Sequence, residues 1–138
     1  MRDKSSAHDD RRRRDRRLTP EGISVAGRHV LLVEDNFHIA KLTALILRNA
    51  GVEVVGPVGT VKDALALIAK AERIDGAALD INLRGETVYP VADALRSMGV
   101  PVLFTTGYDA RSVKSGYTDV PCLQKPVPIE RLIEALFG

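Results

Sequence analysis

Several features are scarce in this sequence of 138 residues, and each scarcity excludes a class of protein. The single cysteine, Cys122, excludes an internal disulfide and a multi-cysteine metal site. Because Cys122 lies in an apolar stretch, we expect it to be a small buried hydrophobe. No apolar run approaches the roughly 18 residues of a membrane span, and no apolar signal segment follows the basic start. We therefore expect a cytoplasmic protein without membrane insertion.

Charge is distributed unevenly along the chain, although the formal net charge is only +2. Residues 1–28 contain nine Arg or Lys and five Asp or Glu, whereas the remainder contains eleven and thirteen. Residues 1–27 also have almost no large apolar side chain to offset the entropy of ordering. We predict a disordered basic N-terminal extension over residues 1–27 and one folded domain over residues 28–138.

The arginine run in this extension, residues 11–14 with Arg16 and Arg17, leaves a second hypothesis open. Such a run can bind nucleic acid or another anionic surface. No aromatic residues interleave with the arginines to stack on bases. We therefore favour a solvated segment, with a nucleic-acid-binding regulator as the alternative.

From residue 29 onward, short apolar segments alternate with segments of helical periodicity. The apolar segments are too short for typical helices and predict five strands, at residues 29–33, 52–58, 76–79, 100–105 and 120–123. Apolar residues at helical spacing predict four amphipathic helices. Their apolar stripes are Ile39, Leu42 and Ile46; Val61, Ala64, Leu65 and Ile68; Val88, Val91, Ala92 and Leu95; and Ile129, Leu132, Ile133 and Leu136.

Local signals mark several helix ends. Gly51 and Gly99 stand where a helix would end in the left-handed conformation, and Thr60 with Asp63 resembles a capping box. Residues 108–119 lack an apolar stripe and contain several small polar residues. The helix between the fourth and fifth strands should therefore be short or irregular.

This alternation predicts an α/β fold with a parallel sheet covered on both faces, because each crossover is right-handed. Five such units fit a flavodoxin-like doubly wound sheet of order 2-1-3-4-5. Its ligand site lies beyond the carboxyl ends of the strands, between strands one and three. No glycine-rich phosphate loop follows the first strand, which disfavours a flavodoxin-like cofactor enzyme.

Polar residues follow four of the predicted strands. Glu34 and Asp35 follow the first, Asp80 the third, Thr105-Thr106 the fourth and Lys125-Pro126 the fifth. Each residue alone has an ordinary structural explanation, such as a helix N-cap or a surface loop. Together they place three carboxylates, a hydroxyl and an ammonium at one edge, and clustered carboxylates suit a hard cation such as Mg²⁺.

The order and spacing of these motifs resemble the receiver domains of two-component response regulators, over residues 29–138. The matching motifs are Glu34-Asp35, Asp80 within Ala-Leu-Asp-Ile-Asn-Leu, Phe104-Thr105-Thr106-Gly107 and Lys125-Pro126. The resemblance implies a protein that accepts a phosphoryl group on Asp80 from a histidine kinase or phosphotransfer protein. Such a protein is not a conventional enzyme. It supplies its own Mg²⁺-dependent phosphotransfer and autodephosphorylation chemistry and signals to an output protein by conformational change.

The resemblance also implies a role for each site residue. Asp35 would bind Mg²⁺ directly, Glu34 directly or through water, and Asn82 through its main-chain carbonyl. Thr106 would be the switch hydroxyl. Lys125 would pair with a phosphoryl oxygen, next to a cis Lys125-Pro126 bond.

The sequence departs from the common receiver pattern at Cys122, where many receivers have a switching Tyr or Phe. Phe104-Thr105-Thr106-Gly107-Tyr108 instead resembles a subfamily with a Phe-Ala-Thr-Gly-Tyr-like motif, often found as single-domain proteins. We therefore expect a stand-alone receiver, with Tyr108 as the candidate replacement for the missing aromatic. A docking module that needs no phosphorylation is a further alternative, but it has no physical need for clustered carboxylates.

Overall fold

In the computed structural model, which describes residues 25–107 and 113–138, five parallel strands form one sheet. Their order is β2-β1-β3-β6-β7, which confirms the predicted order 2-1-3-4-5. The bounds of these strands are β1 (His29–Val33), β2 (Glu53–Val58), β3 (Gly76–Asp80), β6 (Val102–Thr106) and β7 (Cys122–Gln124).

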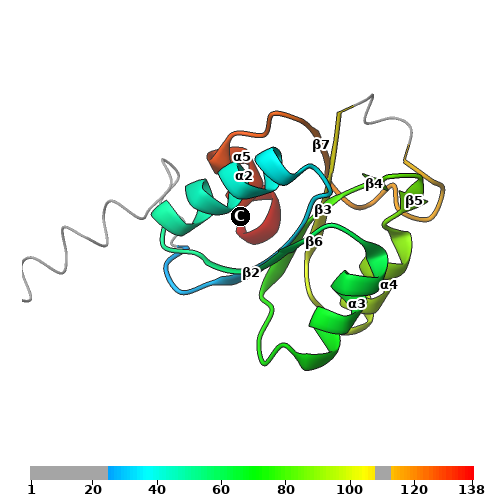
Figure 1. Cartoon of the computed structure of the whole chain (residues 1–138), viewed down its shortest axis with the longest axis horizontal. Coiled ribbons are helices and arrows are strands. Elements are labelled where there is room, and N and C mark those ends of the chain that lie inside the picture. The colour runs from blue at the N-terminus through cyan, green and yellow to red at the C-terminus, as the bar shows by residue number, and fades with distance from the viewer. Residues whose placement is uncertain (1–24, 108–112) are drawn as a thin grey trace, which may run out of the picture.

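Helices cover both faces of this sheet (Figure 1). One face carries α2 (Phe37–Asn49) and α5 (Ile129–Phe137), and the other carries α3 (Val61–Lys70) and α4 (Tyr89–Ser97). Alternate residues of a strand point to opposite faces. In β1, for example, Leu32 belongs to the α2 and α5 core, whereas Leu31 belongs to the α3 and α4 core. The central strands are therefore buried on both sides, as is typical of parallel sheets.

Several predicted helix ends are observed. The Thr60 hydroxyl caps α3 by accepting a hydrogen bond from the Asp63 amide at 3.0 Å. Gly51 and Gly99 have φ angles of 93° and 75°, the left-handed conformation expected after a helix. Local sequence signals thus correctly predicted where these helices begin or end.

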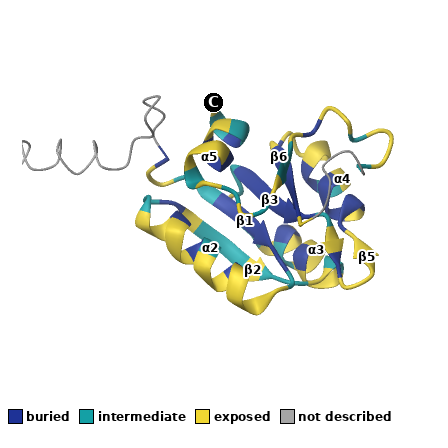
Figure 2. Ribbon diagram, turned by 90° about the horizontal axis from the view of Figure 1, so that it is seen from above, coloured by how far each residue is buried: buried dark blue, intermediate teal, exposed yellow. Residues whose placement is uncertain are grey.

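The predicted apolar stripe of the first helix was wrong. Its members are 39–58% exposed: Ile39, Leu42 and Ile46. The buried side of α2 is formed instead by Ala40, Ala44 and Leu47. The helix is apolar on two overlapping sides, and the small alanines allow closer approach to the sheet. Figure 2 shows the exposed outer side of α2 in yellow.

Leu65 of α3 was also expected in the core but is 37% exposed. The remaining members of that stripe are buried or partly buried against the α3 and α4 core. The buried side of α3 is therefore narrower than the predicted stripe of four residues.

A small hairpin that the sequence analysis did not anticipate follows β3. Its antiparallel strands are β4 (Asn82–Leu83) and β5 (Glu86–Thr87). The two-residue turn consists of Arg84 and Gly85, with φ angles of 51° and 89°. Such turns need positive φ at both central residues, which glycine adopts without steric cost.

The predicted domain boundary needs adjustment at the N-terminus. Val25 is completely buried in the α2 and α5 core, and the Gly27 amide donates to the Gly51 carbonyl at 2.9 Å. The folded domain therefore includes at least three residues of the predicted extension. The rest of that extension, residues 1–24 with the arginine run, lies outside the described residues.

The segment between β6 and β7 is described only from residue 113 onward. Residues 113–119 contain turns and no helix, which agrees with the expected irregularity. Tyr108 lies outside the described residues. Across residues 25–107 and 113–138, the helices are too short or too polar to cross a membrane.

Candidate functional site

The central strands bring the three predicted carboxylates together. β1 and β3 are neighbours, with Val33 paired to Leu79, so both strands end at the same level of the sheet. One carboxylate oxygen from each of Glu34, Asp35 and Asp80 lies within 4.8 Å of the other two. Residues 46 positions apart in the sequence thus form one acidic cluster because their strands pair in register.

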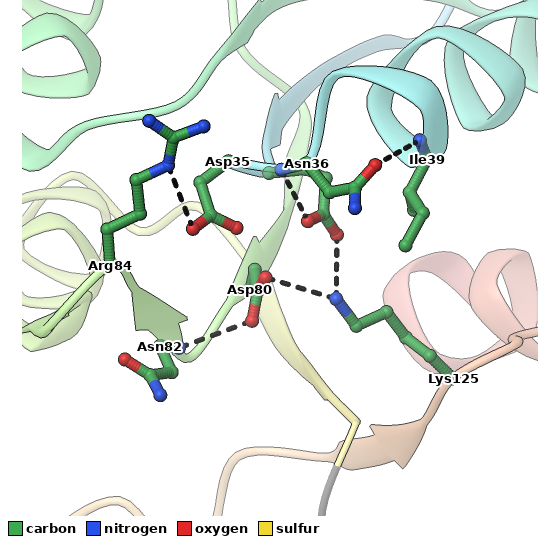
Figure 3. A network of polar contacts seen from close by, with 8 residues as sticks. Asp35, Asn36, Ile39, Asp80, Asn82, Arg84 and Lys125 are labelled. Atoms are coloured by element: carbon green, nitrogen blue, oxygen red, sulfur yellow. Dashed lines mark hydrogen bonds and ion pairs between the residues drawn. The ribbon is translucent and has the colours of Figure 1, made fainter.

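Lys125 bridges two of these carboxylates (Figure 3). Its Nζ donates to Glu34 Oε1 at 2.9 Å and to Asp80 Oδ2 at 3.0 Å. Partial burial opposes the ammonium charge, but hydrogen bonds to Glu34 and Asp80 outweigh it and raise the pKa of Lys125. The lysine therefore stays protonated at neutral pH, with its charge directed at Asp80.

Glu34 and Asp80 are the most buried residues of the acidic cluster, and each is about 95% buried. Burial raises the pKa of Glu34, with hydrogen bonds from Lys125 and the Asn36 amide opposing the shift. Burying a carboxylate is unfavourable unless partners compensate for lost hydration. A cation bound beside Glu34 would offset this cost, so the burial of the carboxylate favours cation binding.

Neither Glu34 nor Asp35 caps the following helix. The N-cap is Asn36, whose Oδ1 accepts a hydrogen bond from the Ile39 amide at 3.0 Å. The Asn36 amide in turn donates to Glu34 Oε2 at 3.1 Å. The simple capping explanation for the acidic pair is thereby excluded.

A cavity of about 430 Å³ opens above the acidic cluster. It is lined by Asp35, Asp80, Asn82, Arg84, Thr106, Gly107 and Lys125. Asp80 Oδ1 accepts a hydrogen bond from the Asn82 amide at 3.2 Å. Thr106 is 2% exposed and is fixed to the next strand because its carbonyl accepts from the Lys125 amide at 2.7 Å.

The donor set of this cavity fits a hard divalent cation. Mg²⁺ takes oxygen ligands, often from one or two carboxylates, and keeps several waters. Three carboxylates in reach of one another, next to an open cavity, meet both requirements. Glu34, Asp35 and Asp80 are the residues able to hold such an ion.

The structure therefore unites six of the predicted site residues: Glu34, Asp35, Asp80, Asn82, Thr106 and Lys125. The Lys125-Pro126 bond is cis, as the resemblance implied. Cys122 does not line the cavity. It is half-buried beside the α3 and α4 core, paired with Phe104 of β6, and burial raises the pKa of its thiol.

Arg84 was missed by the sequence analysis. It lines the cavity, and its Nε lies 3.7 Å from Asp35 Oδ2. The available signal was the glycine of the Arg84-Gly85 pair, which is compatible with a two-residue hairpin turn. That signal gives the turn but not the direction of the side chain.

Comparison with protein families identifies one match, to the response regulator receiver domain, over residues 30–137. A search of curated proteins gave no match. Among solved structures, SdrG from Sphingomonas melonis Fr1 is 40% identical, with a TM-score of 0.70. The similarity covers 83% of this chain and 96% of SdrG.

Two further structures extend the comparison. The BeF₃-activated conformation of SdrG, from Pseudomonas melonis Fr1, is 39% identical with a TM-score of 0.66, covering 80% of this chain and 94% of that one. The receiver domain of PhyR from Erythrobacter litoralis is 26% identical with a TM-score of 0.69, covering 81% and 92%. The fold, the acidic site and these matches lead to one conclusion: the chain belongs to the family of response regulator receiver domains of two-component signalling.

Proposed function

We propose that this receiver accepts a phosphoryl group on Asp80 from a phosphohistidine of a histidine kinase or phosphotransfer protein, in a Mg²⁺-dependent reaction in the cytoplasm. The observation that carries the proposal is the position of Lys125, which donates to Asp80 inside a cluster of three carboxylates. A receiver that served only as a docking surface would gain nothing from this costly concentration of buried charge.

Asp80 is the nucleophile of the proposed reaction. One of its carboxylate oxygens attacks the phosphorus, an acyl phosphate forms, and the phosphorus–nitrogen bond of the donor breaks. The bonding electron pair stays with the imidazole nitrogen, which takes up a proton from solvent. The cavity lined by Asp80 leaves space for the incoming phosphoryl group.

The other site residues stabilise charge in this reaction. Lys125, already within 3.0 Å of Asp80, neutralises charge on a phosphoryl oxygen, and the Thr106 hydroxyl offers a hydrogen bond from the cavity wall. When bound by Glu34, Asp35 and Asp80, Mg²⁺ would supply electrostatic neutralisation of the transferring oxygens. Catalysis is therefore mainly positioning and electrostatics.

The exposed face of α2 supports a protein as the phosphodonor. Five large apolar side chains of α2 are 39–71% exposed: Phe37, Ile39, Leu42, Leu45 and Ile46. A cavity of about 350 Å³ connects this face to the acidic site, since Ile39 and Leu42 line it together with Glu34 and Lys125. A donor that presents phosphohistidine to Asp80 lies next to this apolar surface and can bury it.

A phosphorylation assay tests the proposal. The full chain is incubated with phosphoramidate and Mg²⁺ and analysed by intact mass. The wild type should gain one phosphoryl group, and Asp80→Asn should gain none because the amide is no nucleophile. The matched control is Asp63→Asn, an exposed aspartate in the first turn of α3, which should react like the wild type. Undiminished labelling of Asp80→Asn would refute the assignment.

The nucleic-acid alternative gains no support from the family match or from the similar structures. The arginines on which it depends lie outside the described residues. We therefore propose signalling through protein partners alone.

A further inference from the structure

The β4–β5 hairpin places Arg84 at the rim of the cavity above the acidic cluster. Arg84 Nε lies 3.7 Å from Asp35 Oδ2, the carboxylate expected to bind Mg²⁺ directly. The Arg84 side chain is 80% exposed, whereas that of Asp35 is only 19% exposed. Figure 3 shows Arg84 and Lys125 approaching the acidic cluster from opposite sides.

The conformation of this turn makes arginine an unusual choice. Arg84 is the one non-glycine residue with positive φ in the part of the chain that the structure describes. The first position of such a turn favours Asn, Asp or Gly, because a Cβ in the left-handed conformation lies too close to the following carbonyl oxygen and only Asn and Asp offset this with local hydrogen bonds. An arginine held there suggests a function for its side chain, which the position next to Asp35 supplies.

The two cations of the site differ in freedom of movement. The Lys125 side chain is 20% exposed and donates two short hydrogen bonds, so it is a fixed part of the cluster. Arg84 makes one longer ion pair from an exposed position and can leave it at little cost. Among the three carboxylates of the cluster, Asp35 is therefore the one whose cationic partner can leave it readily.

We propose that Arg84 is a tethered counter-ion of the metal site, which neutralises Asp35 when no metal is bound and competes with Mg²⁺ for that carboxylate. The inference rests on the proposed function, because it takes Asp35 as a metal ligand. Guanidinium and Mg²⁺ cannot both occupy the same side of Asp35, and their like charges repel. Arg84 therefore weakens Mg²⁺ binding. Mg²⁺ binds tightly only when the Arg84 guanidinium pairs with an anion other than Asp35.

Mg²⁺ titration of the unphosphorylated full chain, by calorimetry at low ionic strength, tests the inference. Arg84→Asn removes the charge and suits the left-handed turn, so it should lower the Kd for Mg²⁺ by about 2- to 5-fold, the range for loss of an exposed ion pair. Arg84→Lys keeps a charge at the same position and should stay within about 1.5-fold of the wild type. The matched control is Arg48→Gln, an exposed arginine in the last turn of α2, which should not change the Kd.

The outcomes separate this inference from the proposed function. If Asp35→Asn abolishes Mg²⁺ binding while Arg84→Asn leaves it unchanged or weaker, the counter-ion role is wrong and the metal site stands. If Arg48→Gln tightens binding as much as Arg84→Asn does, the effect is one of overall charge and the role is also wrong. If Asp35→Asn does not affect binding, both the metal site and the role of Arg84 are refuted.

Discussion

The ring of Tyr117 is stacked on the ring of Tyr89, with centroids 4.4 Å apart and ring planes inclined by 28°. Two hydrogen bonds reinforce this contact: the Tyr117 hydroxyl donates to Asp93 at 2.7 Å, and the Lys114 amide donates to the Tyr89 hydroxyl at 2.8 Å. Side-chain contacts with α4 therefore hold residues 113–119, which contain no helix. Segments held in this way open more readily than core strands.

This relationship leads to a prediction about the switch. Since Cys122 replaces the usual aromatic, phosphorylation should be reported by the segment after Thr106. We expect beryllofluoride with Mg²⁺ to accelerate exchange of the Lys114 amide, whose partner is Tyr89, while amides of β7 around Cys122 change little. Hydrogen exchange followed by NMR measures both regions in one sample.

Thr106→Ala provides the control for this prediction. The variant should still bind beryllofluoride at Asp80, because the nucleophile and Lys125 remain, but exchange at Lys114 should no longer respond. A response around Cys122 without one at Lys114 would show that the signal travels by another route.

The apolar face of α2 gives a second prediction. Leu45→Glu, at a residue that is 53% exposed and lines neither site cavity, should lower the rate of phosphotransfer from the cognate phosphorylated kinase at least about tenfold, because a buried leucine contributes about 1.5–3 kcal/mol to an interface. The rate with phosphoramidate should be unchanged, since a small donor needs no docking surface. Comparing both donors by intact mass separates docking from chemistry.

Met98→Glu is the matched control, since Met98 is 56% exposed at the end of α4 and away from the lining of both site cavities. It should leave both rates unchanged. Equal slowing by the two variants would argue against α2 as the specific docking face.

Glu34 gives a prediction about pH. Burial raises its pKa above the ordinary value of 4.5, so its ionisation in the folded state lowers stability. The stability that Glu34 contributes is fully present below pH 4.5 and is lost as pH rises through the raised pKa. Without Mg²⁺, Glu34→Gln should therefore be more stable than the wild type at pH 7, and the difference should vanish below pH 4.5.

Denaturant unfolding at several pH values measures this difference. The comparison with the wild type at each pH cancels the contributions of titrating groups that do not interact with Glu34, which leaves Glu34 and its partners Lys125 and Asp80. A Glu34→Gln variant that is less stable at pH 7 would show that the hydrogen bond from Lys125 outweighs the burial of the charge.

The N-terminal boundary gives a fourth prediction. Removing residues 1–24 should leave the free energy of unfolding nearly unchanged, because that sequence has few large apolar residues. Removing residues 1–27 also removes the fully buried Val25 and should cost about 1.5–3 kcal/mol more. Denaturant unfolding of the two truncated chains measures the difference, and equal stabilities would contradict the role of Val25 in the core.

The sequence alone was sufficient for the strand order and for most of the site. Strand and helix periodicities are local, and the chirality of βαβ crossovers leaves few topologies for five alternating units. Once the order is known, residues that follow the strands must meet at one edge. Glu34, Asp80 and Lys125 could therefore be predicted to converge although they are far apart in the chain.

Other features depended on contacts that no local pattern contains. Helix α2 is apolar on two sides, and only the geometry of packing decides that Ala44 faces the sheet while Leu42 faces outward. The hairpin strands β4 and β5 have two residues each, too few for a periodic signal.

The sequence by itself determined which groups reach the site from the strand ends, because backbone periodicity and chain direction fix where each strand stops. Tertiary structure alone decided which charges pair there: Lys125 with Glu34 and Asp80, and Arg84 with Asp35. The physical reason is range. Periodicity acts over a few residues, whereas an ion pair forms only when two side chains from distant segments come within about 4 Å in a common environment.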